Sequence, residues 1–323
     1  MRTLRSVAAL ALLGILLPSG SRAQEESHPR SFQLQAQSPA FWKLVDPKAK
    51  PSVVASGFGF TEGPVWDPAG FLYVSDEIAN KIFRVYTNKT DGRKETLIEL
   101  GDPDGNTFDS RHRLIDCASV MRAIIWVNGS HNSILADRYQ GKRFNSPNDV
   151  IIGPDRAIYF TDPTLDLPKG EKQEIPFQGV YRLGANGRVT LLTKDLSQPN
   201  GLAFSPDGKR FYVDDSEQRN IRVYDVAKNG GLTNGRVFGE EPGGHHEGVP
   251  DGMKVDREGN LFVTGPKGIW VWDKDGNHLG TIVMPEQPAN LAWGDKDYRT
   301  LYITATTSIY KLRTKTHGYI PYH

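Results

Sequence analysis

The chain has 323 residues, of which 38% are hydrophobic and 24% are charged, and its formal net charge is +1. This composition is sufficient for one large or two ordinary folded domains and excludes wholesale disorder. The single cysteine excludes an internal disulfide and a cysteine-rich metal site, and the near-neutral charge gives no sign of a nucleic-acid partner. Frequent glycine and proline, together with 10% aromatic residues, are typical of many short strands.

The first residues have the layout of a signal peptide. Two arginines precede an apolar run, Val7–Leu17, which is followed by small residues ending at Ala23. The run is too short to favour a permanent membrane anchor, and no later segment is a candidate span. We therefore expect residues 1–23 to be removed, residues 24–51 to form an N-terminal extension, and the mature protein to be periplasmic or secreted, with no membrane partner.

From Glu62 onward one pattern recurs along the chain. A turn-like anchor is followed by a short apolar stretch, a polar turn and a strand with alternating aromatic residues, most clearly after Glu62 and after Asn200. A repeat period of about 40–50 residues with about four strands per repeat is typical of a β-propeller. The equivalent anchor positions are Glu62, Asp104, Asn148, Asn200, Asp251 and Ala289.

The strand count predicts how the ring closes. After Ala289 the chain holds only three strand candidates, whereas Ser52–Ser56, upstream of the first anchor, resembles the fourth strands of the other repeats. If Ser52–Ser56 completes the last blade, the ring has no open sheet edge to invite aggregation. We therefore predict an all-β fold, a six-bladed β-propeller over residues 52–323 whose last blade is closed by an N-terminal strand.

The anchors are candidate metal ligands, because the innermost strands of a propeller line its central channel and equivalent positions converge at one mouth. Carboxylate and amide oxygens are hard ligands that suit Ca²⁺ or Mg²⁺, with Mn²⁺ also accommodated. In a single repeat, Asn or Asp beside proline and glycine would be a simple turn former. Four oxygen donors that lie in well-formed copies of the repeat favour the metal interpretation: Glu62, Asn148, Asn200 and Asp251. The fifth, Asp104, lies in a weaker copy.

Four sequence strings closely resemble one family, the gluconolactonase/regucalcin (senescence marker protein) family. They are Phe60–Trp66, Asn145–Val150, Gln198–Phe204 and Pro250–Asp256, and the resemblance extends from about Ser52 to Leu312. It implies a six-bladed propeller that holds one divalent cation at the channel mouth and hydrolyses sugar lactones or related cyclic esters. Among the candidate cations Ca²⁺ comes first, followed by Mg²⁺, Mn²⁺ and Zn²⁺.

The resemblance also implies roles for individual residues. Glu62, Asn200 and Asp251 match the metal ligands of the family, and Asn148 matches an asparagine that contacts substrate or metal. Asp251 further matches the proposed general base, and whether it acts as base, ligand or both stays open. His245 and His246 lie just upstream and are candidates for base chemistry, although two solvated loop histidines are the simpler interpretation.

The mechanism implied is attack of an activated water on a lactone carbonyl that the cation polarises. Asn148 would orient the small lactone or ester substrate. Two alternatives stay open: a promiscuous esterase or phosphotriesterase of the paraoxonase type, and a non-catalytic ligand-binding propeller that keeps a structural ion. The sequence leaves open which lactone is the substrate and what the oligomeric state is.

Overall fold

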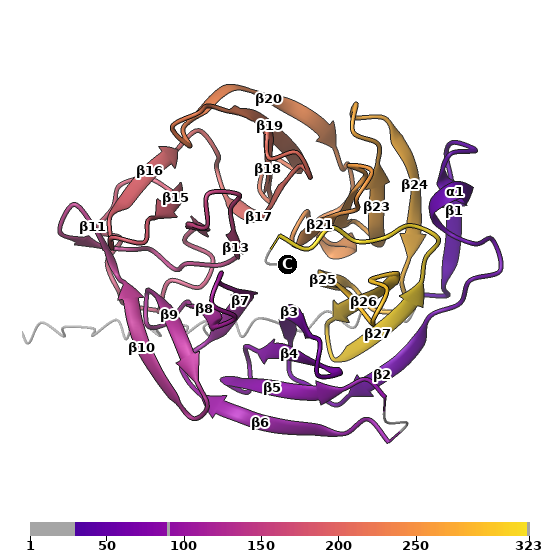
Figure 1. Cartoon of the computed structure of the whole chain (residues 1–323), viewed down its shortest axis with the longest axis horizontal. Helices are drawn as coiled ribbons and strands as arrows, with labels where there is room; N and C mark the ends of the chain where they lie inside the picture. The colour runs from indigo at the N-terminus through magenta and orange to yellow at the C-terminus, as the bar shows by residue number, and fades with distance from the viewer. Residues whose placement is uncertain (1–29, 89–90, 322–323) are drawn as a thin grey trace, which may run out of the picture.

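The chain forms a ring of six antiparallel sheets around a central axis, as the computed structural model shows (Figure 1). The structure describes residues 30–88 and 91–321, so the expected signal peptide, residues 1–23, lies outside the described residues. Blades 1 to 4 each have four strands that follow one another in the chain. The N-terminal segment supplies the fourth strand of blade 6 and a fifth strand of blade 5. The prediction of an all-β, six-bladed propeller is confirmed.

The first three blades follow each other directly along the chain. A short hairpin, β11 (Arg138–Tyr139) and β12 (Lys142–Arg143), stands between the second and the third blade. The strands are β3 (Thr61–Asp67), β4 (Phe71–Asp76), β5 (Lys81–Tyr86) and β6 (Lys94–Glu99) in blade 1, β7 (Pro103–Phe108), β8 (Leu114–Ala118), β9 (Ala123–Asn128) and β10 (His131–Ala136) in blade 2, and β13 (Val150–Ile152), β14 (Ile158–Asp162), β15 (Gly179–Leu183) and β16 (Val189–Thr193) in blade 3.

Blades 4 to 6 repeat the same arrangement, and a short 3₁₀ helix, η1 (His245–Glu247), precedes blade 5. Their strands are β17 (Pro199–Phe204), β18 (Arg210–Asp215), β19 (Asn220–Val226) and β20 (Leu232–Glu240) in blade 4, β21 (Met253–Val255), β22 (Leu261–Gly265), β23 (Gly268–Trp272) and β24 (His278–Val283) in blade 5, and β25 (Pro288–Gly294), β26 (Thr300–Ala305) and β27 (Ser308–Arg313) in blade 6.

The N-terminal strand β2 (Ser52–Ser56) supplies the fourth strand of blade 6. It pairs antiparallel with β27, with Ser52 opposite Lys311 and Ser56 opposite Ser308. Blade 6 therefore combines the first and the last parts of the propeller sequence, and the two are side by side in Figure 1. This closure, which was predicted from the strand count, pairs an edge that would otherwise be open.

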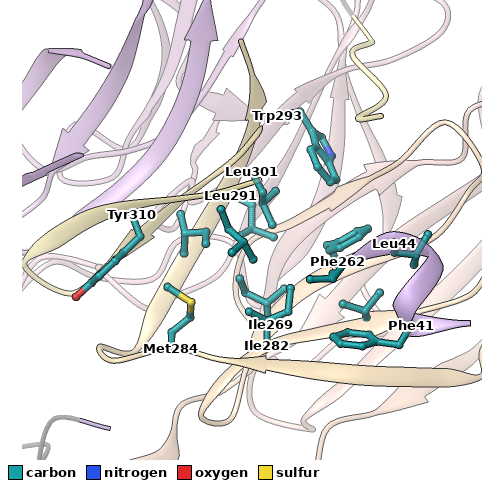
Figure 2. Packing of buried hydrophobic residues seen from close by; sticks show 14 of the residues in the cluster. Phe41, Leu44, Phe262, Ile269, Ile282, Met284, Leu291, Trp293, Leu301 and Tyr310 are labelled. Atoms are coloured by element: carbon teal, nitrogen blue, oxygen red, sulfur yellow. The ribbon is translucent and has the colours of Figure 1, made fainter. Parts of the chain in front are cut away.

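The N-terminal extension packs on blade 5. Strand β1 (Gln33–Ala36) pairs with β24 and makes this sheet five-stranded. The short helix α1 (Phe41–Leu44) follows, and its Phe41 side chain is fully buried beside Phe262 and other core residues (Figure 2). Within the ranges that the structure describes, no helix is long and apolar enough to span a membrane.

The innermost strands are irregular at their anchors. The register between the first and second strand shifts just after Glu62 in β3, and equivalent shifts occur in β7, β17 and β25. Such bulges re-aim side chains at the end of a strand. Hydroxyl groups of the second strands fasten the bulges: the Ser75 hydroxyl donates to the Asp104 carbonyl at 2.7 Å, and the Thr264 hydroxyl donates to the Ala289 carbonyl at 2.7 Å. Both bonds link one blade to the next.

Candidate active site

Three of the four predicted metal ligands lie close together at one mouth of the channel, and the fourth, Asn148, is linked to Glu62 through Asp104. Glu62, Asn148 and Asn200 are buried, and Asp251 is half-buried. The Asp251 carboxyl interacts with the Asn200 amide and is close enough to Glu62 and Asp149 for their charges to act on it. Residues separated by up to 189 positions in the sequence therefore meet, as the repeat predicts, while their chemical roles stay predictions.

Glu62 keeps one carboxylate oxygen without a protein partner. Its Oε2 atom accepts hydrogen bonds from the backbone N–H of Gly63 and, at 2.8 Å, from the Asn290 side chain. Its Oε1 atom is buried and accepts no hydrogen bond from the described residues. Burial, and next the negative charge of Asp149, raise the pKa of Glu62 to about 8. A buried oxygen of this kind is costly unless something binds it, and a cation would satisfy it.

The two asparagines have their amide nitrogens occupied by the protein. Asn148 Nδ2 donates to Asp104 Oδ2 at 2.7 Å. Asn200 Nδ2 donates to the Ser216 hydroxyl at 3.2 Å, and that hydroxyl in turn donates to the Pro250 carbonyl at 2.7 Å. Because the donor end of each amide is engaged, the carbonyl oxygen is the end that remains for a ligand.

Further carboxyl groups that the sequence analysis did not select surround these anchors. Burial, followed by the charges of Asp166 and Glu62, raises the pKa of Glu77 well above its usual range. Burial, and then the charge of Asp166, raises the pKa of Asp102 to about 7. Asp104, the anchor of the second repeat, also has its pKa raised by burial and then by the charge of Glu77. The mouth therefore concentrates negative charge, which a divalent cation would offset.

No simple sequence signal marks Glu77, Asp102 and Asp166 as a group. Glu77 follows the end of β4, Asp102 precedes β7, and Asp166 lies in the loop after β14. All three lie within four residues of an end of a first or second strand, so a rule that collects every acid near those strand ends would have found them. The anchor pattern alone could not.

Three other aspartates, which end the second strands β4, β14 and β18, cap turns. Asp76 accepts hydrogen bonds from the backbone N–H groups of Gly59 and Phe60 at 2.9 and 3.1 Å. Asp162 accepts from Asn145 N at 2.9 Å, and Asp215 accepts from Ser197 N at 2.6 Å. These carboxylates hold the loops that carry the anchors.

The donor set fits a hard cation bound partly by neutral ligands. Across residues 30–88 and 91–321, no group of three or more His, Cys, Asp or Glu side chains is arranged to hold a metal ion. An ion bound by Glu62 and Asp251 would therefore need the amide oxygens of Asn148 and Asn200 as well. Two carboxylates and two amide oxygens match the preference of Ca²⁺ and Mg²⁺ for oxygen ligands.

The histidine pair lies in η1. His246 is exposed and lies beside Glu247, which pairs with Lys267 at 2.8 Å. The Glu247 carboxylate also accepts a hydrogen bond from Gly244 N at 3.0 Å. These contacts agree with a solvated loop at His246 and give it no link to the four anchors.

Comparison with known proteins identifies the family. The model of the SMP-30/Gluconolactonase/LRE-like region matches residues 60–307. The chain belongs to this family. It is 34% identical to a gluconolactonase from Zymomonas mobilis, in an alignment that covers 97% of this chain and 95% of that protein. The family that was predicted from the four sequence strings is thereby confirmed.

Solved structures agree with this assignment. The structure of a gluconolactonase from Xanthomonas campestris is 31% identical, with a TM-score of 0.81, and the match covers 88% of this chain and 96% of that one. A calcium-binding protein, regucalcin, from Agrobacterium tumefaciens shares the fold at 21% identity, with a TM-score of 0.71 and coverage of 84% and 96%. The gluconolactonase relatives are enzymes that hydrolyse lactones, so the chain is a member of a lactonase family.

Proposed function

We propose that the protein is an exported lactonase that binds one divalent cation, Ca²⁺ in the first place, at the channel mouth and opens a small sugar lactone. The observation that carries the proposal is the buried Oε1 of Glu62, which accepts no hydrogen bond from the described residues and belongs to a carboxyl group whose charge acts on Asp251. Membership of the lactonase family supports the reaction class. The signal-peptide pattern of residues 1–23 supports export.

A cation held by Glu62, Asn148, Asn200 and Asp251 would supply Lewis-acid polarisation of the lactone carbonyl. Asp251 would take a proton from the attacking water if it acts as the base, and its raised pKa, which burial and then the charge of Glu62 cause, supports that role, whereas direct binding of the cation would make it less basic. The water oxygen bonds to the carbonyl carbon, the ring C–O bond breaks, and the proton passes to the ring oxygen that leaves. Asn148 would hold the ring in position.

The acidic mouth also suits the charge change of this reaction. A sugar lactone is neutral, whereas the hydroxy acid that it yields is an anion at neutral pH. The carboxyl groups of Glu77, Asp102 and Asp166 lie close enough for their charges to act on one another, and whichever of them are ionised would repel that anion. The site therefore favours entry of a neutral ester and release of an acidic product.

The proposal is tested by a pH-stat assay of the purified mature protein with glucono-δ-lactone, before and after treatment with a chelator. We expect turnover to be lost on chelation and to return with Ca²⁺, because the polarising ion is removed and restored. Turnover that is insensitive to the chelator would contradict the cation. Cation binding measured by calorimetry without hydrolysis of any lactone, ester or phosphotriester in a substrate panel would instead indicate a ligand-binding propeller.

The export proposal has a separate test. Expression of the full chain with its native leader should yield a periplasmic or secreted protein whose N-terminus, determined by mass spectrometry, follows Ala23. Retention of the intact N-terminus in the cytoplasmic fraction would refute it.

A further inference from the structure

Two departures from the repeat place polar side chains in the channel beneath the anchors. In four blades the residue after the anchor is glycine, whereas it is Asp149 in blade 3 and Asn290 in blade 6. Blades 3 and 6 stand on opposite sides of the ring (Figure 1). The Asn290 Nδ2 atom nevertheless lies 3.4 Å from the Asp149 Oδ2 atom, so the two side chains meet across the channel.

The glycines of the neighbouring blades leave the space that these side chains fill. A Cβ atom on Gly252 would lie 2.1 Å from Asn290 Cγ, and one on Gly105 would lie 2.5 Å from Asp149 Oδ1. A side chain at either position would collide with the polar group beside it. We refer to Asp149, Asn290 and Lys254, which joins them from β21, as the channel floor.

Lys254 determines the orientation of the Asn290 amide, that is, which side its oxygen and its nitrogen face. The Lys254 ammonium donates to Asn290 Oδ1 at 2.9 Å, and the backbone N–H of Leu291 donates to the same oxygen at 2.8 Å. An ammonium group can only donate and a carboxylate can only accept. A reversed amide would present its NH₂ to two donors, the Lys254 ammonium and the Leu291 N–H, so these two groups allow only one orientation.

This orientation fixes the Glu62 carboxylate. Asn290 Nδ2 donates to Oε2 of Glu62 at 2.8 Å, and Gly63 N donates to the same oxygen. Both donors act on Oε2, and Oε1 is left buried without a protein partner. The positive charge of Lys254 favours the ionised forms of Glu62 and Asp149 and so lowers the pKa of each. The charges that act most on Asp251 are negative and raise its pKa.

We propose that Asn290, oriented by Lys254, is a positioning residue that turns the Glu62 carboxylate so that Oε1 faces the cation. Neither residue would touch the substrate. The inference rests on the proposed cation site, because the orientation of Glu62 matters for function only if its free oxygen is a ligand. Groups that orient metal ligands in this manner typically change metal affinity by about 10- to 100-fold when they are removed.

The main test measures Ca²⁺ affinity by calorimetry for the wild type, Asn290→Leu, Glu62→Gln and the double variant. We expect Asn290→Leu to weaken Ca²⁺ binding roughly tenfold or more and to lower kcat while KM for the lactone stays unchanged. Because Asn290 acts through Glu62, its substitution should add little to the loss that Glu62→Gln causes. Additive effects of the two substitutions, or wild-type affinity in Asn290→Leu, would overturn the proposal.

Lys254→Met should also weaken Ca²⁺ binding, and Lys254→Arg should restore part of it by keeping charged donors at Asn290. Tighter binding in Lys254→Met would mean that Lys254 only repels the ion, and its positioning role would be wrong. Lys94→Met is the matched control, since Lys94 Nζ donates to the carbonyls of Ser56 and Gly57, away from the floor, at 3.1 and 2.8 Å. It should leave Ca²⁺ affinity unchanged, even if it lowers the melting temperature.

The wild-type measurements separate the two proposals. If the wild type binds no divalent cation, the proposed function and this inference both fail. If it binds Ca²⁺ and shows chelator-sensitive turnover, but the floor variants match it in affinity and kcat, only this inference fails.

Discussion

The two faces of the ring use acidic residues in opposite ways. On the face of the turns between first and second strands, Asp109 pairs with Arg113 and Asp155 with Arg182, each at 2.6 Å. At the channel mouth, by contrast, the charges acting most strongly on Glu77 come from Asp166, Glu62 and other acids. Aspartates that pair with an arginine stabilise turns, whereas carboxyl groups that crowd together with few positive charges are destabilising and mark a site for a ligand.

The largest effect is expected at the mouth. Asp251→Asn should lower kcat/KM for a lactone by about 10³-fold, because it removes both a negatively charged ligand and the proposed base. The propeller should stay folded, since the change relieves repulsion from Glu62 and Asp149. Turnover, circular dichroism and the melting temperature check this expectation, and near-normal activity in a folded variant would refute the assigned role.

The next largest effect is expected for a side chain introduced at the channel floor. Gly252→Ala should cost about 1–3 kcal/mol of stability, because its Cβ would lie 2.1 Å from Asn290 Cγ and must displace that side chain. Ca²⁺ affinity should fall with it. Gly231→Ala serves as the control, because its Cβ would meet only the Asn229 side chain, at 3.1 Å. Denaturant unfolding that shows equal stability for the two variants would contradict the tight packing.

A buried acid away from the mouth predicts a pH effect. Glu241 is fully buried, its Oε1 accepts from Trp272 Nε1 at 3.1 Å, and burial raises its pKa well above the usual range. Above the ordinary pKa of 4.5 the folded state keeps a proton that the unfolded chain releases, so the free energy of unfolding falls as pH rises. The slope for one group is at most about 1.4 kcal/mol per pH unit.

Glu241→Gln removes this dependence, so its stability relative to the wild type should increase between pH 4.5 and 7.5 in denaturant titrations. Glu95→Gln is the control of opposite sign. Hydrogen bonds from Arg93 and Tyr86 lower the pKa of the half-buried Glu95, and its contribution to stability is therefore present above the ordinary pKa and lost as pH falls. Parallel pH profiles for the two variants would contradict the difference between their environments.

The smallest effect is expected on the opposite face. Arg182→Met breaks the partly exposed pair with Asp155 and should cost no more than about 1 kcal/mol of stability. Salt should reduce that cost, and kcat/KM should not change. A loss of activity would show that the two faces of the ring are coupled and that the paired aspartates do more than stabilise turns.

The sequence alone determined the architecture and the four anchors. Each repeat is a local unit, because its turns and strands form from turn residues and alternating aromatic residues that lie within about 50 positions of one another. Equivalent positions of such units must converge at one mouth, so Glu62, Asn148, Asn200 and Asp251 could be selected without coordinates. The closing strand Ser52–Ser56 followed from the same count.

Only the tertiary structure decided what surrounds those anchors. Glu62 and Asn290 are 228 positions apart and bond across the seam where the ring closes, which no local pattern specifies. Glu77, Asp102 and Asp166 gather because three loops bend over the same mouth, and β1 and α1 settle on blade 5 because apolar surface is available there. Side-chain contacts of this kind depend on how blades pack against each other, so they exist only once the ring is complete.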